Sequence, residues 1–77
     1  MSIRWRWYKT SFGEWLCHPW TESKWLVSAS PAGYHWRWGL VNPMDAPVEE
    51  GMAPSLAAAK RTCKRVWIRR FGVWPPC

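Results

Sequence analysis

Tryptophan alternates with arginine in two separate stretches of this chain, and this alternation constrains the fold more than any other feature. The segments Trp5-Arg6-Trp7 and Trp36-Arg37-Trp38 both show it. Successive side chains of a β-strand point to opposite faces of the sheet, so the spacing places the indoles on one face and the guanidinium on the other. We therefore expect strands with a tryptophan-rich face and a basic face.

The turn residues between such stretches predict three or four antiparallel strands. We expect strands at residues 3–9, 24–30 and 34–41, with shorter candidates at 15–18 and 48–53. Pro19 has no backbone N–H, which restricts the 15–18 strand to an edge of the sheet. The turn Pro31-Ala32-Gly33 joins two of the strands into a hairpin. Gly51 marks either a bulge or the end of pairing.

The hydrophobic period changes from two to about 3.6 after residue 54, which predicts one helix. Ser55 is the expected N-cap and Gly72 the expected stop of a helix over residues 55–71. Its core-facing stripe contains Leu56, Ala59, Cys63, Val66 and Trp67. Residues 72–77 are expected to form an extended tail. The predicted fold is therefore α+β, with a three- to four-stranded antiparallel sheet and one C-terminal amphipathic helix packed on one face.

A chain of 77 residues predicts a single domain over residues 1–77, with residues 1–53 mainly β. A domain this small needs large core side chains, and nine tryptophans supply them. We expect five or six to pack on one sheet face and the others to remain at the surface, where exposed aromatic side chains often mark a contact site.

The charge balance is strongly basic, with 11 Lys and Arg against 5 Asp and Glu and a net charge of +6. This balance favours anionic partners, namely nucleic acid, an acidic protein surface or a membrane. Six of the basic residues lie on the predicted helix, and residues 56–71 contain no acid. Like charges four residues apart, such as Arg61 and Arg65, slightly destabilise a helix, which favours a functional use of this face over a merely solvated one.

The sequence contains no recognisable catalytic, cofactor or metal motif. Its three cysteines lack the C-x-x-C spacing of a zinc site, and His18 and His35 stand outside any known nucleophile motif. Glu49 and Glu50 point to opposite faces of a strand and so cannot act as a carboxylate pair. We expect no enzyme activity, no cofactor and no metal.

The odd cysteine count and the lack of a signal-peptide pattern predict a reduced, cytoplasmic protein. Arg/Trp alternation is also typical of membrane-active peptides, but the strand and helix pattern indicates a folded domain, so a membrane partner is not expected. The expected contact surface combines the basic helix face, the outward face of the first strand and two tryptophans beside prolines: Arg61, Lys64, Arg65, Arg69, Arg4, Arg6, Tyr8, Trp20 and Trp74.

The segment from Gly51 to Lys64, together with Trp36-Arg37-Trp38, resembles a pattern in small phage and prophage proteins of βββα build. Several anti-CRISPR proteins share this size and layout, and the resemblance covers residues 24–67. The same ending is similar to the last helix of double-stranded RNA-binding domains, whose first helix this chain lacks. The first resemblance implies a compact protein that blocks a host nucleoprotein complex by occupying one surface.

Two functional hypotheses follow. In the first, the chain is an accessory inhibitor from a phage or mobile element that binds a host protein or ribonucleoprotein defence complex stoichiometrically. In the second, it binds nucleic acid directly, with phosphate contacts from the helix and base stacking on exposed tryptophans.

Overall fold

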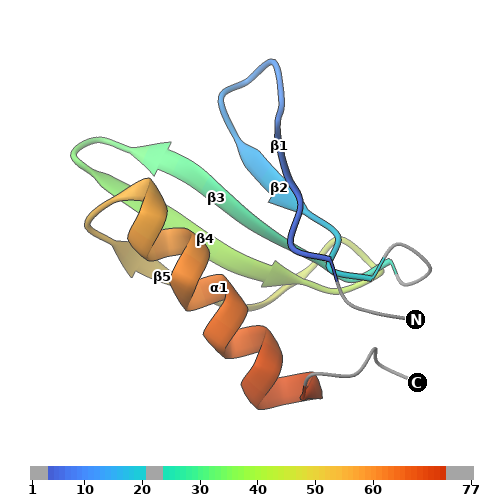
Figure 1. Ribbon diagram of the computed structural model, residues 1–77. Coiled ribbons are helices and arrows are strands. Elements are labelled where there is room, and N and C mark those ends of the chain that lie inside the picture. Colours follow the sequence, from blue (N-terminus) through green and yellow to red (C-terminus); the bar gives the residue numbers. More distant parts are fainter. Residues whose placement is uncertain (1–3, 21–23, 73–77) are drawn as a thin grey trace.

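The computed structural model describes residues 4–20 and 24–72, and every structural statement below concerns these residues. Five strands precede one helix along the chain (Figure 1). The elements are β1 (Trp7–Lys9), β2 (Trp15–Cys17), β3 (Leu26–Ala32), β4 (His35–Val41), β5 (Pro47–Ala53) and α1 (Leu56–Phe71). The α+β class is confirmed, but the sheet has five strands, not three or four.

The strands form one antiparallel sheet in sequence order, β1-β2-β3-β4-β5. The register continues across the sheet, as in the row Lys9, Trp15, Ala29, Trp38 and Gly51. Every pairing therefore connects strands that are neighbours in sequence. The paired part of the first strand is shorter than the predicted 3–9 and begins at Trp7.

The expectation that the 15–18 strand lies at an edge is wrong. β2 pairs with β1 on one side and with β3 on the other. The strand ends at Cys17, so Pro19 lies beyond the hydrogen-bonded residues and removes no bond from the sheet.

The β3–β4 hairpin closes later than predicted. Ala32 pairs with His35, which leaves Gly33 and Tyr34 as a two-residue turn, with a φ of 67° at Gly33. Residues that flank such a turn form a hydrogen-bonded pair, so Pro31 occupies the next, non-hydrogen-bonded position. Its missing N–H is directed away from β4, which explains how a proline lies within this strand. Tyr34 is in the turn and 97% exposed, not on the tryptophan face.

The helix follows its sequence signals closely. The Ser55 hydroxyl accepts a hydrogen bond from the Ala58 N–H at 3.1 Å, as an N-cap does. Gly72 has a φ of 75°, and its N–H donates to the Ile68 carbonyl at 2.7 Å. Ala59, Cys63, Val66 and Trp67 are buried, which confirms most of the predicted stripe.

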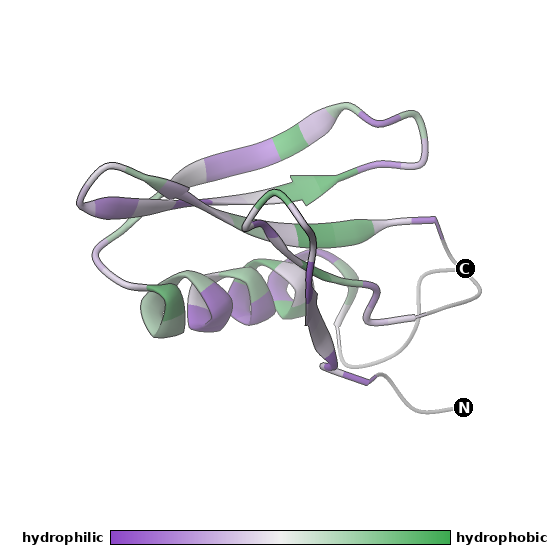
Figure 2. Ribbon diagram, turned by 90° about the horizontal axis from the view of Figure 1, so that it is seen from above, coloured by the Kyte–Doolittle hydropathy of each residue, from purple (hydrophilic) through white to green (hydrophobic). Residues whose placement is uncertain are grey.

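Only one face of the sheet carries the helix (Figures 1 and 2). α1 lies over β3, β4 and β5 and is centred on β4. The core between the two layers contains Val27, Leu40, Trp67 and the smaller side chains of Cys17 and Cys63. We call the uncovered side of the sheet the open face.

Tryptophans gather on the helix side of the sheet, as predicted. Six of them are half-buried there and pack against the core: Trp5, Trp7, Trp15, Trp25, Trp36 and Trp38. A single helix is too narrow to cover all five strands, so these tryptophans remain partly exposed. Trp67 is the tryptophan that the described structure buries completely.

Gly51 lies within β5 directly opposite Trp38, where pairing continues. A Cβ at Gly51 would approach the Trp38 ring to 2.9 Å, so the glycine provides space for the indole. The sheet irregularity is located instead between Leu40 and Val41, and pairing continues beyond Gly51 to Ala53, so both predicted roles of Gly51, a bulge and the end of pairing, are wrong.

Candidate functional site

The six cations of α1 do not form one uniform surface, because the fold gives several of them partners. The Lys60 ammonium lies 4.3 Å from the ring centroid of Trp15 and 5.5 Å from that of Trp7. The Lys64 ammonium lies 6.0 Å from the Trp5 ring. These cation–π contacts connect the helix to the β1–β2 hairpin. Lys60 is half-buried in this arrangement, whereas Lys64 remains exposed.

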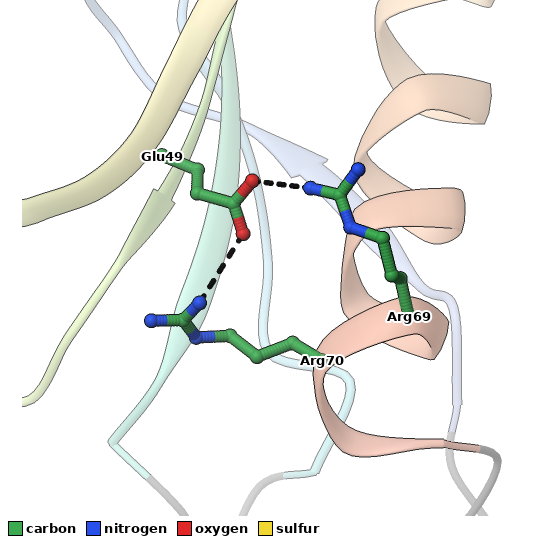
Figure 3. A network of polar contacts seen from close by, with 3 residues as sticks. All are labelled: Glu49, Arg69 and Arg70. Carbon is green, nitrogen blue, oxygen red and sulfur yellow. Dashed lines mark hydrogen bonds and ion pairs between the residues drawn. The ribbon is translucent and has the colours of Figure 1, made fainter.

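Glu49 on β5 partly compensates the positive charge at the C-terminal turn of the helix (Figure 3). Its carboxylate accepts hydrogen bonds from Arg69 through Oε1 and from Arg70 through Oε2, the latter at 3.4 Å. Arg69 was predicted as a contact residue, and its side chain is 66% exposed, but its charge is partly compensated by this ion pair.

The solvent side of α1 carries four side chains that we call the outer helix face: Arg61, Lys64, Arg65 and Ile68. All four are exposed. Arg61 and Arg65 have no ion-pair partner among the described residues. Ile68 lies one turn beyond Lys64 and Arg65 and is 38% exposed, so the face has an apolar side chain among its cations.

A second basic surface lies on the open face, at the β1–β2 end of the sheet. Arg4, Arg6 and Tyr8 alternate with Trp5 and Trp7 and are exposed, as the period of two predicted. The Arg4 N–H donates to the Pro19 carbonyl at 2.8 Å, which holds the segment before β1 beside the segment after β2.

His18, which follows β2, lies beside Tyr8 on this second basic surface. Its Nε2 is hydrogen-bonded to the Tyr8 hydroxyl at 3.2 Å, and the two ring planes are parallel to within 6°. A pocket of about 300 Å³ opens here, and we call it the open-face pocket; its lining residues are Arg4, Arg6, Trp7, Tyr8 and His18.

Of the two tryptophans predicted to be exposed, only Trp20 lies within the described residues, and it does not extend either surface. Trp20 is half-buried, and its indole nitrogen is buried without a hydrogen-bond partner among the described residues. Trp74 lies outside the described residues.

Three participants were not predicted from the sequence. From the sequence, His18 belongs to no functional motif, Lys60 is one of six cations on a basic helix, and Glu49 enters only as half of an excluded carboxylate pair. The sequence did contain one usable signal, because residues 15–18 and 3–9 can pair as a hairpin, and His18 then lies beside Arg6. Glu49 and Arg69 are 20 residues apart, and no local pattern connects them.

The two cysteines of the core are buried thiols. Burial raises the pKa of Cys17 to about 11 and the pKa of Cys63 to about 12. The backbone hydrogen bond from Arg6 and the charge of Lys60 lower the Cys17 pKa, but both effects are weaker than that of burial. In residues 4–20 and 24–72, no three His, Cys, Asp or Glu side chains lie together in a way that would hold a metal ion.

No protein-family model, curated protein or solved structure matches this chain. The fold class is therefore what the structure itself defines, an α+β domain with a five-stranded antiparallel sheet and one helix. Within the described part of the chain, no helix is both long enough and apolar enough to cross a membrane.

Proposed function

We propose that this chain is a small non-enzymatic protein that binds an acidic surface of a protein or ribonucleoprotein complex through its outer helix face. The observation that carries the proposal is the presence of two exposed guanidinium groups, Arg61 and Arg65, that form no ion pair with any described residue, on a helix whose other arginines are paired with Glu49. Such a charge distribution attracts and orients an acidic partner.

Ile68 favours a protein surface over nucleic acid at this face. Protein interfaces commonly have an apolar centre with polar and basic residues around it, and arginine is enriched there. Ile68 lies next to Lys64 and Arg65 along the helix and is partly exposed. Phosphate contacts use no apolar side chain, so a purely electrostatic nucleic-acid surface leaves Ile68 without a role.

The biological setting of the proposal is that of a phage or mobile-element accessory protein. Its size and its strand-then-helix order resemble anti-CRISPR proteins, so the host complex is a defence complex that the chain inhibits stoichiometrically. The assignment to a defence complex is supported by this resemblance of layout, which is an analogy, and not by particular residues of the site.

A plaquing assay tests the setting. Cells with active CRISPR interference that express this chain should allow plaques of a targeted phage, and unchanged interference would show that the defence-complex target is wrong. Titration of the purified complex with the chain should then abolish its activity at a fixed molar ratio.

The contact surface is tested with variants of matched charge. R61Q/R65Q removes two charges from the outer helix face and should weaken inhibition at least about tenfold, which corresponds to about 1.4 kcal/mol. K24Q/R37Q removes two charges from exposed positions elsewhere and should inhibit as the parent chain does. Equal loss in both variants would mean that net charge, and not this face, governs binding.

A further inference from the structure

The open-face pocket is separate from the outer helix face, because none of the residues that line it belongs to α1. Besides Trp7, which packs against the core, the pocket is lined by two guanidinium groups and two aromatic rings, those of Arg4, Arg6, Tyr8 and His18. These four side chains lie on the open face, whereas α1 and the core occupy the other side of the sheet. The arrangement therefore needs an explanation other than packing.

Arg4 and Arg6 are exposed and form no ion pair with any described residue. By strand alternation, the carboxylates on the same face of the described sheet are Glu14, at the turn end of the hairpin, and Glu50. Glu50 is four strand spacings of about 4.8 Å from Tyr8 in the register of the sheet. Two adjacent, uncompensated guanidinium groups are suited to a phosphate, which they contact with several N–H donors.

Tyr8 and His18 supply a flat aromatic surface beside these cations. Their ring centroids are 6.2 Å apart, and their planes differ by 6°. The hydrogen bond between Tyr8 Oη and His18 Nε2 connects atoms at the ring edges, so it holds the two rings as a parallel, offset pair. Tyr8 is 46% exposed, which leaves ring surface available for a planar ligand.

A ligand that matches both parts has a phosphate and an exposed planar ring. Unpaired nucleotides have both, whereas the bases of a duplex are stacked and paired, and only its phosphates are accessible. A volume of about 300 Å³ is at the small end of ligand pockets and accommodates one small ligand. We propose that the open-face pocket binds a nucleotide of a single-stranded nucleic acid, with Arg4 and Arg6 on the phosphate and the base stacked on Tyr8 and His18.

This inference adds a second binding site to the proposed function and does not depend on it. The ligand class, nucleic acid, is that of the second hypothesis from the sequence, but the residues proposed to bind it are different. The stacking groups are Tyr8 and His18 instead of free tryptophans, and the phosphate contacts come from the first strand instead of the helix.

The test is fluorescence anisotropy with a labelled oligothymidine, and with a labelled DNA duplex of the same length, at two salt concentrations. We expect the single strand to bind in a salt-dependent manner, with a log–log slope of roughly −0.7 for each phosphate contacted, and more tightly than the duplex. R4Q/R6Q should reduce the affinity and make the slope less steep by about 1.4. Y8A should reduce the affinity by about 5- to 100-fold, as loss of a stacking ring does, while Y8F, which keeps the ring and loses only its hydrogen bond to His18, should reduce the affinity less than Y8A.

R61Q/R65Q is the matched control, because it removes the same charge from the other side of the molecule. It should leave single-strand affinity and slope unchanged. Near-UV circular dichroism checks that Y8A is folded, and R4Q/R6Q and Y8F test the site even where Y8A is not. The proposal is overturned by an absence of salt-sensitive binding to the single strand, by equal or tighter duplex binding, or by an equal effect of R61Q/R65Q.

Discussion

The ammonium group of Lys60 on α1 lies over the indole of Trp15 on β2, with Nζ 4.3 Å from the ring centroid. Backbone contacts of the helix are confined to β3, β4 and β5 in the described structure. The hairpin of β1 and β2 therefore meets the helix through side chains, and Lys60 is central among them. From the sequence, Lys60 belongs to a basic binding helix, but in the structure it packs the helix against two indoles of the β1–β2 hairpin.

Replacing Lys60 should for this reason destabilise the protein. We expect K60Q to lower the free energy of unfolding by about 1 kcal/mol, because it removes a half-buried cation from two indoles. K64Q is the control, since Lys64 is exposed and at the limit of the contact distance, and it relieves the same Lys60–Lys64 repulsion. Urea unfolding followed by tryptophan fluorescence measures both, and equal effects would contradict a structural role for Lys60.

Glu49 should limit the size of the basic surface. E49Q frees Arg69 and Arg70 from their ion pairs, so we expect tighter binding to a polyanion, seen as elution from heparin at higher salt. E50Q changes the net charge equally at the adjacent residue, which points to the open face, and should have the smaller effect. The stability cost of E49Q should stay below about 1 kcal/mol, because the ion pairs are partly exposed. A larger shift for E50Q than for E49Q would argue against this role.

Gly51 should be intolerant of any side chain. In G51A the new Cβ would lie 2.9 Å from the Trp38 ring, and displacing an indole packed in the core should cost about 1–3 kcal/mol. In G39A the nearest atom is the Ser28 hydroxyl oxygen at 3.3 Å, which can rotate away, so the cost should be below about 1 kcal/mol. Chemical denaturation of the two variants provides the comparison, and similar midpoints would show that Trp38 moves without cost.

The buried thiols should make the fold sensitive to alkali. Above an ordinary thiol pKa of 9.0, an unfolded chain releases the protons of Cys17 and Cys63, whereas the folded chain retains them up to about 11 and 12. The folded state then binds more protons, so its stability falls as pH rises through this range, by about 1 kcal/mol per pH unit for each thiol.

Urea unfolding in reductant, at pH values from about 8 to about 10, should show this decline. The C17A/C63A variant should be less stable at the lower pH, because it leaves cavities, but its stability should decline less steeply. Parallel declines in parent and variant would assign the alkaline sensitivity to other groups.

Local signals were sufficient for the helix. Ser55, the buried stripe and Gly72 act within one or two turns of one another, so their roles were predictable from spacing alone. The strand faces were predictable for the same reason, since alternation is a property of a single strand. The pairing of β2 was not, because a proline near a strand end indicates an edge only when it falls inside the hydrogen-bonded residues.

The binding surfaces were predictable in part. Arg4, Arg6 and Tyr8, and also Arg61 and Arg65, are exposed where the sequence pattern placed them. Which cations remain unpaired depends on contacts between elements, such as those of Glu49 with α1, which no local pattern encodes.

The sequence by itself thus determined the α+β class, the tryptophan and basic faces of the strands and the limits of the helix, because these follow from periodicities within single elements. The tertiary structure alone decided that β2 is an internal strand, that Lys60 and Glu49 compensate parts of the basic helix, and that His18 joins Tyr8 beside Arg4 and Arg6. Each of these features depends on contacts between residues that are distant in sequence, either across the sheet or between the sheet and the helix. Packing and charge pairing determine those contacts, and no local pattern encodes them.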